Sequence, residues 1–254
     1  IEGVDKLGSV EHAVVHYRIE EATYLAADGI AGGEINLVGA RPDHMDMLCQ
    51  KVGEMGMRIS ADSNGLWVMA NKTLKAVDLA TLPYPGIATD YKPFLVAMLA
   101  VSEGVGIVTE NLFSGRFRYI DELIRMGADI RTEGHHAVIR GVENLSGAPV
   151  RAHDIRAGAA LVVAALRAQG QTEIREPSHI DRGYENLFYQ EKNHLVVDEE
   201  NQHTNRYRSI DKNKVPGFTT TMKTKPLVVA KMEEYTREKM VKLKSTRLID
   251  ELFV

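Results

Sequence analysis

Cysteine is almost absent from this sequence: Cys49 is the one cysteine among 254 residues. A single cysteine cannot form an internal disulfide bond, which favours a reducing, cytoplasmic location. No apolar run reaches the roughly 18 residues that a membrane span requires, and no basic and then apolar leader is present, so we expect neither a membrane segment nor a secretory signal. The chain begins with Ile1 in place of Met, which we take to indicate the interior of a longer protein.

Signatures of cofactors and metals are also missing. Neither a Gly-x-Gly-x-x-Gly fingerprint nor a P-loop occurs, so no nucleotide cofactor is predicted. His135 and His136 are adjacent, but neighbours on a strand point to opposite faces and chelate a metal poorly. No Cys-x-x-Cys pair occurs, and we expect no metal site. The net charge of −4 is too small to indicate a nucleic-acid or membrane partner.

What the chain does contain is typical of a globular protein, with 44% hydrophobic and 26% charged residues. The composition changes near residue 185. Residues 1–185 hold 5 Lys, 23 Ala and 20 of the 21 Gly, whereas residues 186–254 hold 9 Lys, 1 Ala and only Gly217. The formal charges of the two parts are −7 and +3. We therefore predict a domain over residues 1–185 and a distinct tail over residues 186–254.

The first part contains an internal repeat in which a helix, a turn glycine, a short strand and a second helix follow one another. The interval from Gly33 to Met55, which contains the strand and the second helix, is 22 residues. The interval from Gly104 to Met126 has the same pattern and the same length. Each first helix is alanine-rich or apolar, and glycine follows it as a left-handed cap should. The pattern predicts an α/β fold of repeated β-α-β-α-β-β units.

A third copy of the repeat begins with a predicted helix over residues 156–168, a turn at Gly170 and a strand over residues 172–174. Its second helix should end near residue 192, but the sequence there is polar and has no helical period. The repeat therefore stops where the composition changes, and both signals place a junction at residues 185–187. We expect the tail to be mixed α/β or partly disordered.

Three arginines, Arg116, Arg156 and Arg182, stand in turns marked by glycine or aspartate beside predicted strand ends. Arg116 and Arg182 occupy equivalent places, each 12 residues after the turn glycine of its repeat. Guanidinium groups gathered in this way can bind a carboxylate or a phosphate through paired N–H donors. The alternative is that the three are solvated surface residues or form structural ion pairs with Asp154 and Asp181.

Asp90 lies where a loop meets a predicted helix, and two interpretations are open. Thr89 or Asp90 could serve as the N-cap of that helix, because both residue types are favoured there. Asp90 could instead accept a hydroxyl proton from a bound sugar. Cys49 lies on a predicted helix beside Leu48, and we expect it to be a packed core residue.

Nine short motifs run through the first part of the chain: residues 3–7 (GVDKL), 18–20 (RIE), 83–86 (PYPG), 89–90 (TD), 109–111 (TEN), 116–117 (RF), 126–129 (MGAD), 145–148 (LSGA) and 179–184 (HIDRGY). The intervals are 26 residues from Asp90 to Arg116, and 40 from Arg116 to Arg156. A further 26 residues lead to Arg182. In motifs and spacing, residues 1–185 resemble the C-terminal half of the UDP-N-acetylglucosamine 1-carboxyvinyltransferases, a family of enolpyruvyl transferases.

The resemblance implies an enzyme that transfers the enolpyruvyl group of phosphoenolpyruvate to the 3′-hydroxyl of UDP-N-acetylglucosamine, in the first committed step of peptidoglycan synthesis. It implies a fold of two inside-out α/β domains around a shared cleft. Asp90 would be the general base or orient the hydroxyl, and Leu112 would line the UDP-sugar site. The resemblance assigns one further group of residues to the substrates, with the arginines facing phosphoenolpyruvate: Arg116, Asp154, Arg156 and Arg182.

The sequence also departs from this family. Ser114 and Gly115 stand where the family usually has Glu-Asn, and His16 and Tyr17 replace a Pro-Asp. The family's N-terminal half, with its Lys-Asn contact to phosphoenolpyruvate and its proton-donating loop cysteine, is not matched, and Cys49 has the wrong context to be that cysteine. We therefore expect this chain to need the missing domain as a partner and not to turn over alone.

Residues 186–254 resemble part of the nuclease domain of a phage terminase large subunit, in residues 217–220 (GFTT), 223–227 (KTKPL) and 245–252 (STRLIDEL). An amphipathic helix is predicted over residues 226–244. No site is assigned to the tail's acidic residues, and our hypothesis for the whole chain is a chimera. Two alternatives stay open: a 3-phosphoshikimate 1-carboxyvinyltransferase, or a non-catalytic ligand-binding or phage DNA-packaging fragment.

Overall fold

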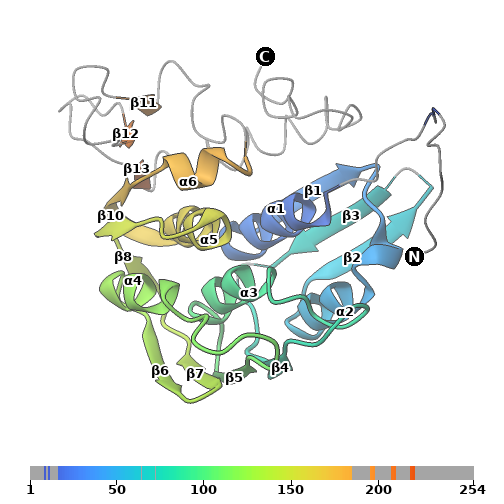
Figure 1. Cartoon of the computed structure of the whole chain (residues 1–254), viewed down its shortest axis with the longest axis horizontal. Helices are drawn as coiled ribbons and strands as arrows, with labels where there is room; N and C mark the ends of the chain where they lie inside the picture. Colours follow the sequence, from blue (N-terminus) through green and yellow to red (C-terminus); the bar gives the residue numbers. More distant parts are fainter. Residues whose placement is uncertain are drawn as a thin grey trace.

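A computed structural model describes residues 17–184 except for positions 64 and 72, together with positions 9 and 11 and three short strands beyond residue 194. The predicted junction at residues 185–187 and the predicted helix over residues 226–244 lie outside the described residues. The structure therefore describes the predicted domain from residue 17 to residue 184, apart from positions 64 and 72 (Figure 1).

The first repeat begins with α1 (Arg18–Ala31), and Gly32 is the C-cap of this helix. Gly32 has φ 72°, which confirms the predicted glycine turn. The rest of the repeat is a short 3₁₀ helix, a second helix and a sheet: β1 (Gly33–Val38), η1 (Pro42–His44), α2 (Asp46–Glu54), β2 (Arg58–Asp62) and β3 (Gly65–Ala70). The sheet has the order β1-β3-β2 and is antiparallel throughout.

The second repeat has the complete predicted order of elements: β4 (Leu79–Ala80), α3 (Lys92–Leu99), β5 (Val105–Thr109), α4 (Tyr119–Arg125), β6 (Asp129–Glu133) and β7 (His136–Arg140). Its sheet has the order β4-β5-β7-β6, in which β4 runs parallel to β5 and the other pairs are antiparallel. The order β5-β7-β6 repeats the order β1-β3-β2 of the first copy. The β-α-β-α-β-β prediction is thus confirmed for this unit.

The third copy consists of two short strands, a helix, a long strand and a helical turn: β8 (Leu145–Ser146), β9 (Pro149–Arg151), α5 (Ile155–Ala165), β10 (Ala168–Arg175) and α6 (Ser178–Asp181). The predicted boundary between helix and strand was wrong. The chain turns at Leu166 and Arg167, whose N–H groups donate to the carbonyls of Val163 and Ala164. Gly170 therefore lies inside β10, where it has φ 90°.

Three short strands follow in the tail: β11 (Leu195–Val197), β12 (Tyr207–Ser209) and β13 (Phe218–Thr220). β11 pairs with β12, and β13 pairs antiparallel with the part of β10 that begins at Gly170.

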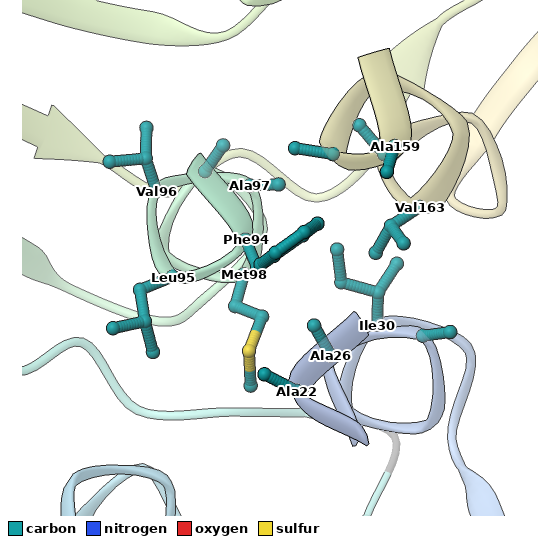
Figure 2. Packing of buried hydrophobic residues seen from close by; sticks show 14 of the residues in the cluster. Ala22, Ala26, Ile30, Phe94, Leu95, Val96, Ala97, Met98, Ala159 and Val163 are labelled. Carbon is teal, nitrogen blue, oxygen red and sulfur yellow. The ribbon is translucent and has the colours of Figure 1, made fainter. Parts of the chain in front are cut away.

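The core lies between α1, α3 and α5, each of which packs against the other two (Figure 2). All eight residues of α3 are buried, which is expected of a helix that is apolar around most of its circumference. Small side chains at Ala22, Ala26 and Ala159 let the helices approach closely, and Phe94 and Met98 fill the space between them. A Cβ at Gly29 of α1 would lie 2.7 Å from Met98 Cε, so the tip of the Met98 side chain would have to shift to accommodate a larger residue.

Each central helix also packs on the sheet of its own repeat: α1 on β1 and β3, α3 on β5 and β7, and α5 on β10. The three sheets therefore surround the three helices (Figure 1). Cys49 lies on α2, partly buried against the core as expected, and burial raises the pKa of its thiol to about 11. Among the described residues no helix has the length and apolarity needed to cross a membrane.

Candidate functional site

Asp90 lies in the turn that leads into α3, and it does not cap that helix. The N-cap position is Tyr91, and no side chain caps the helix start. The N-cap interpretation of Thr89 and Asp90 was therefore wrong, because both side chains are turned to long-range partners that the local sequence does not reveal. The Thr89 hydroxyl donates to Glu110, 21 residues further on, and the Asp90 carboxylate faces two arginines.

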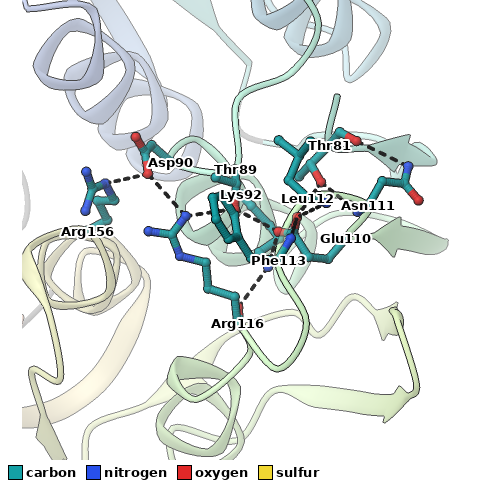
Figure 3. A network of polar contacts seen from close by, with 10 residues as sticks. All are labelled: Thr81, Thr89, Asp90, Lys92, Glu110, Asn111, Leu112, Phe113, Arg116 and Arg156. Carbon is teal, nitrogen blue, oxygen red and sulfur yellow. Dashed lines mark hydrogen bonds and ion pairs between the residues drawn. The ribbon is translucent and has the colours of Figure 1, made fainter. Parts of the chain in front are cut away.

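Those arginines are Arg156, the second residue of α5, and Arg116, in the loop between β5 and α4. Asp90 Oδ1 lies 2.7 Å from Arg156 Nε and 3.6 Å from Arg116 Nη1 (Figure 3). The side chains of Asp90, Arg116 and Arg156 are 26%, 39% and 28% exposed, so all three lie partly at the surface, although Asp90 Oδ1 and Arg156 Nε are themselves buried. Two positive groups on one carboxylate leave a net positive charge, which suits an anion.

The structural alternative predicted an ion pair between Asp154 and these arginines, but Asp154 forms no such pair. Its Oδ1 accepts hydrogen bonds from the backbone N–H groups of Arg156 and Ala157, both at 2.9 Å. Asp154 is thus the N-cap of α5 and fixes the helix start from which Arg156 projects. Its implied contact with a substrate stays a prediction.

Arg182 lies at the end of α6 and is exposed, and it makes no ion pair with any other residue that the structure describes. Close packing brings its segment to the start of α5. A Cβ at Gly158 would lie 2.5 Å from Ile180 Cγ1, and one at Gly183 would lie 2.5 Å from Ile155 Cγ2. The structure thus joins Asp90, Arg116 and Arg156 through contacts and places Arg182 on a neighbouring segment.

Glu110, at the end of β5, is the residue that sequence reasoning missed. It is 1% exposed and both of its oxygens are used. Oε1 accepts from Thr81 Oγ1 at 2.7 Å and from the backbone N–H groups of Leu112 at 2.8 Å and Phe113 at 3.1 Å. Oε2 accepts from Thr89 Oγ1 at 2.7 Å. Glu110 therefore orders the start of the loop that carries Leu112, whose side chain is half-buried.

Lys92 completes this network and is fully buried, with its Nζ 2.6 Å from Glu110 Oε2. Burial lowers the pKa of Lys92 from its ordinary value. Burial alone would raise the pKa of Glu110, but the hydrogen bonds that it accepts outweigh this effect and hold the pKa at about 2. The Glu110 carboxyl group is thus ionised at neutral pH. A lysine before the apolar run of α3 gave no signal of this role, because a charged residue at a helix end is usually solvated.

The described residues include no group of three or more His, Cys, Asp or Glu side chains that could hold a metal ion. His135 lies in the turn before β7 and His136 begins that strand, so the two are not neighbours on one strand as expected. His136 Nδ1 is 2.9 Å from Thr109 Oγ1.

Comparison with known proteins adds family information to this geometry. A family model described as EPSP synthase (3-phosphoshikimate 1-carboxyvinyltransferase) matches residues 1–190. UDP-N-acetylglucosamine 1-carboxyvinyltransferase 1 of Symbiobacterium thermophilum is 49% identical over 187 residues, which are 74% of this chain and 42% of that protein. The Nocardia farcinica UDP-N-acetylglucosamine 1-carboxyvinyltransferase is 45% identical over 190 residues, 75% of this chain and 45% of that protein. The chain thus spans less than half the length of these curated relatives.

Two solved structures share the fold. The enolpyruvyl transferase NikO from Streptomyces tendae superposes with a TM-score of 0.61 and 23% identity, over 76% of this chain and 44% of that one. The EPSP synthase from Acinetobacter baumannii superposes with a TM-score of 0.52 and 20% identity, over 74% of this chain and 44% of that one. At these identities the likeness concerns the mixed α/β fold alone.

Proposed function

Because the chain belongs to the EPSP synthase (3-phosphoshikimate 1-carboxyvinyltransferase) family, we propose that it contributes half of the active site of an enolpyruvyl transferase. The proposed reaction moves the enolpyruvyl group of phosphoenolpyruvate to the 3′-hydroxyl of UDP-N-acetylglucosamine and releases phosphate. Relatives 45–49% identical to the chain carry the name of that reaction. The single observation that supports the chemistry is Asp90, 26% exposed and flanked by Arg116 and Arg156.

In this proposal the sugar hydroxyl oxygen forms a bond to C2 of phosphoenolpyruvate, and C3 takes up a proton. The tetrahedral adduct then loses phosphate from C2 and a proton from C3, which restores the double bond. Asp90 accepts the hydroxyl proton or orients the hydroxyl. Arg116 and Arg156 bind the phosphate and carboxylate groups and stabilise the charge of the adduct, with Arg182 joining them. Leu112 lines the sugar-nucleotide side.

The proton that C3 takes up has no donor among the residues proposed here, so the scheme requires a second domain. We propose that the whole enzyme has two inside-out α/β domains that close over a shared cleft, and that this chain alone does not turn over. A place in cytoplasmic peptidoglycan synthesis follows from the proposed substrates.

The division of the chain stays part of the proposal. A domain over residues 1–185 and a foreign, terminase-like tail over residues 186–254 would explain why the family match stops at residue 190. A long DNA read through the codons for residues 185–187 tests the chimera directly. If the junction persists in single molecules the fusion is real, and if it vanishes the tail is an artefact.

Phosphate release tests the reaction. We would supplement the chain with the separately expressed N-terminal half of the Symbiobacterium thermophilum relative. Phosphoenolpyruvate is then added with one of two acceptors, UDP-N-acetylglucosamine or 3-phosphoshikimate. Release with UDP-N-acetylglucosamine supports the proposal. Release only with 3-phosphoshikimate would favour the alternative that the family description names. Salt-dependent binding to duplex DNA without phosphate release would favour a DNA-packaging fragment.

A further inference from the structure

Lys92 is a buried lysine two residues after Asp90, and its ammonium group has three N–H donors. One contact is the carboxylate of Glu110, with Nζ 2.6 Å from Oε2. A second is the backbone carbonyl oxygen of Arg116, which accepts at 2.8 Å. The third is the ring of Phe117, whose centroid lies 4.1 Å from Nζ. A buried charge is costly unless it is paired and hydrogen-bonded, and here every donor has a partner.

The loop from Leu112 to Arg116 is held at both ends by this one ion pair. Glu110 accepts the N–H group of Leu112 at its start, and Lys92 donates to the carbonyl of Arg116 at its end. The loop between them is more open, because Phe113 is 54% exposed. The position of the loop relative to Asp90 therefore depends on a contact made inside the core.

The side chain of Arg116 is tied to the same carboxylate by a second route. Its Nη1 donates to Thr89 Oγ1 at 3.2 Å, and Thr89 Oγ1 donates to Glu110 Oε2 at 2.7 Å. The ring of Phe113 also packs against the guanidinium, with its centroid 4.9 Å from Arg116 Cζ. Arg116 is thus linked to Glu110 in two ways: its backbone carbonyl through Lys92, and its guanidinium through Thr89 (Figure 3).

We propose that Lys92 is a positioning residue for Arg116: by holding the Arg116 carbonyl and Glu110 together, it sets the guanidinium beside Asp90 in the arrangement that receives an anion. The identity of that anion as phosphoenolpyruvate rests on the proposed function. The positioning of Arg116 by Lys92 does not depend on it. Lys92 touches no ligand in this role, since it is fully buried behind the loop.

The test uses the full 254-residue chain as wild type and as Lys92→Met, which keeps the length of the side chain and removes the charge. Lys51→Met is the matched control, because Lys51 makes an ion pair of the same 2.6 Å length with Glu54 on the surface of α2. Folding is checked by circular dichroism. The readouts are the Arg116 Nε–H resonance, assigned by its loss in Arg116→Lys, and the affinity for phosphoenolpyruvate by calorimetry.

We expect Lys92→Met to shift and broaden the Arg116 resonance and to weaken phosphoenolpyruvate binding on the order of tenfold to a hundredfold, as small misplacements of a binding group do. Lys51→Met should change neither. A folded Lys92→Met protein with an unchanged Arg116 resonance would overturn the proposal. A shifted resonance in Lys92→Met, together with no phosphate release by the wild-type chain supplemented with the N-terminal half, would support the positioning role and count against the proposed function.

If Lys92→Met does not fold, Thr89→Val provides the second test. It leaves the ion pair between Lys92 and Glu110 in place and removes the link from the Arg116 guanidinium to Glu110. We expect the Arg116 resonance to move while the melting temperature changes little. An unmoved resonance would show that the guanidinium is not positioned through Glu110 and would overturn the proposal.

Discussion

The buried carboxylate of Glu110 makes a specific prediction about acid stability. Its pKa is about 2 in the folded protein, against an ordinary value of 4.5. Because the folded pKa is the lower one, the stabilisation is fully present above pH 4.5 and is lost as the pH falls toward 2. At about 1.4 kcal/mol per pH unit, this interval corresponds to about 3 kcal/mol of unfolding free energy. Glu110 is 1% exposed, so solvent screening reduces this value little.

Urea denaturation at a series of pH values between 7 and 2 measures this contribution. Glu110→Gln should be less stable than wild type at pH 7, because it leaves the ammonium of Lys92 buried without its carboxylate. Between pH 4.5 and 2, however, the variant should lose about 3 kcal/mol less than wild type. Glu54→Gln is the control, since Glu54 is paired but 52% exposed, and it should follow wild type. Parallel curves for wild type and Glu110→Gln would refute the reasoning.

Three further predictions concern the site and its frame. Asp90→Asn should lower phosphate release in the supplemented assay by about a hundredfold or more, and an unchanged rate would remove Asp90 from the mechanism. Asp154→Ala should cost about 1 kcal/mol in urea denaturation, because α5 loses its N-cap. Gly158→Ala should lower the free energy of unfolding by about 1–3 kcal/mol, since its Cβ would lie 2.5 Å from Ile180. In the control Gly53→Ala, in α2, the new Cβ meets nothing within 4 Å, and the free energy of unfolding should rise by up to about 1 kcal/mol.

The repeat and its helices could be predicted from the sequence because their signals are local. Gly32 has positive φ directly after α1, and such a position favours glycine. Gly104 and Gly170 misled the same argument: both have positive φ, but the helices before them had already ended at Leu99 and Ala165. A glycine marks an unusual backbone conformation, and the sequence alone does not say whether that conformation is a turn or part of a strand.

The candidate site was predicted only in part, for a related reason. Arg116 and Arg156 were identified because the sequence places each in a turn marked by glycine or aspartate beside a predicted strand end, although Arg156 is in fact the second residue of α5. Their shared partner, Asp90, was open to an N-cap interpretation that depends on nearby residues alone. The ion pair between Lys92 and Glu110 joins α3 to the end of β5, and nothing in the sequence around either residue indicates a contact across that distance.

The charges of the site explain why its two arginines need such support. Asp90 can neutralise one guanidinium, and the second remains positive, so mutual repulsion of Arg116 and Arg156 would drive both toward solvent. Instead, the backbone of each arginine is held in place. Arg156 projects from a helix start that Asp154 caps, and Arg116 is held at its carbonyl by Lys92. The entropy of ordering two long side chains is thus lost during folding, before an anion binds, and an anion that replaces the contacts to Asp90 meets a preorganised site.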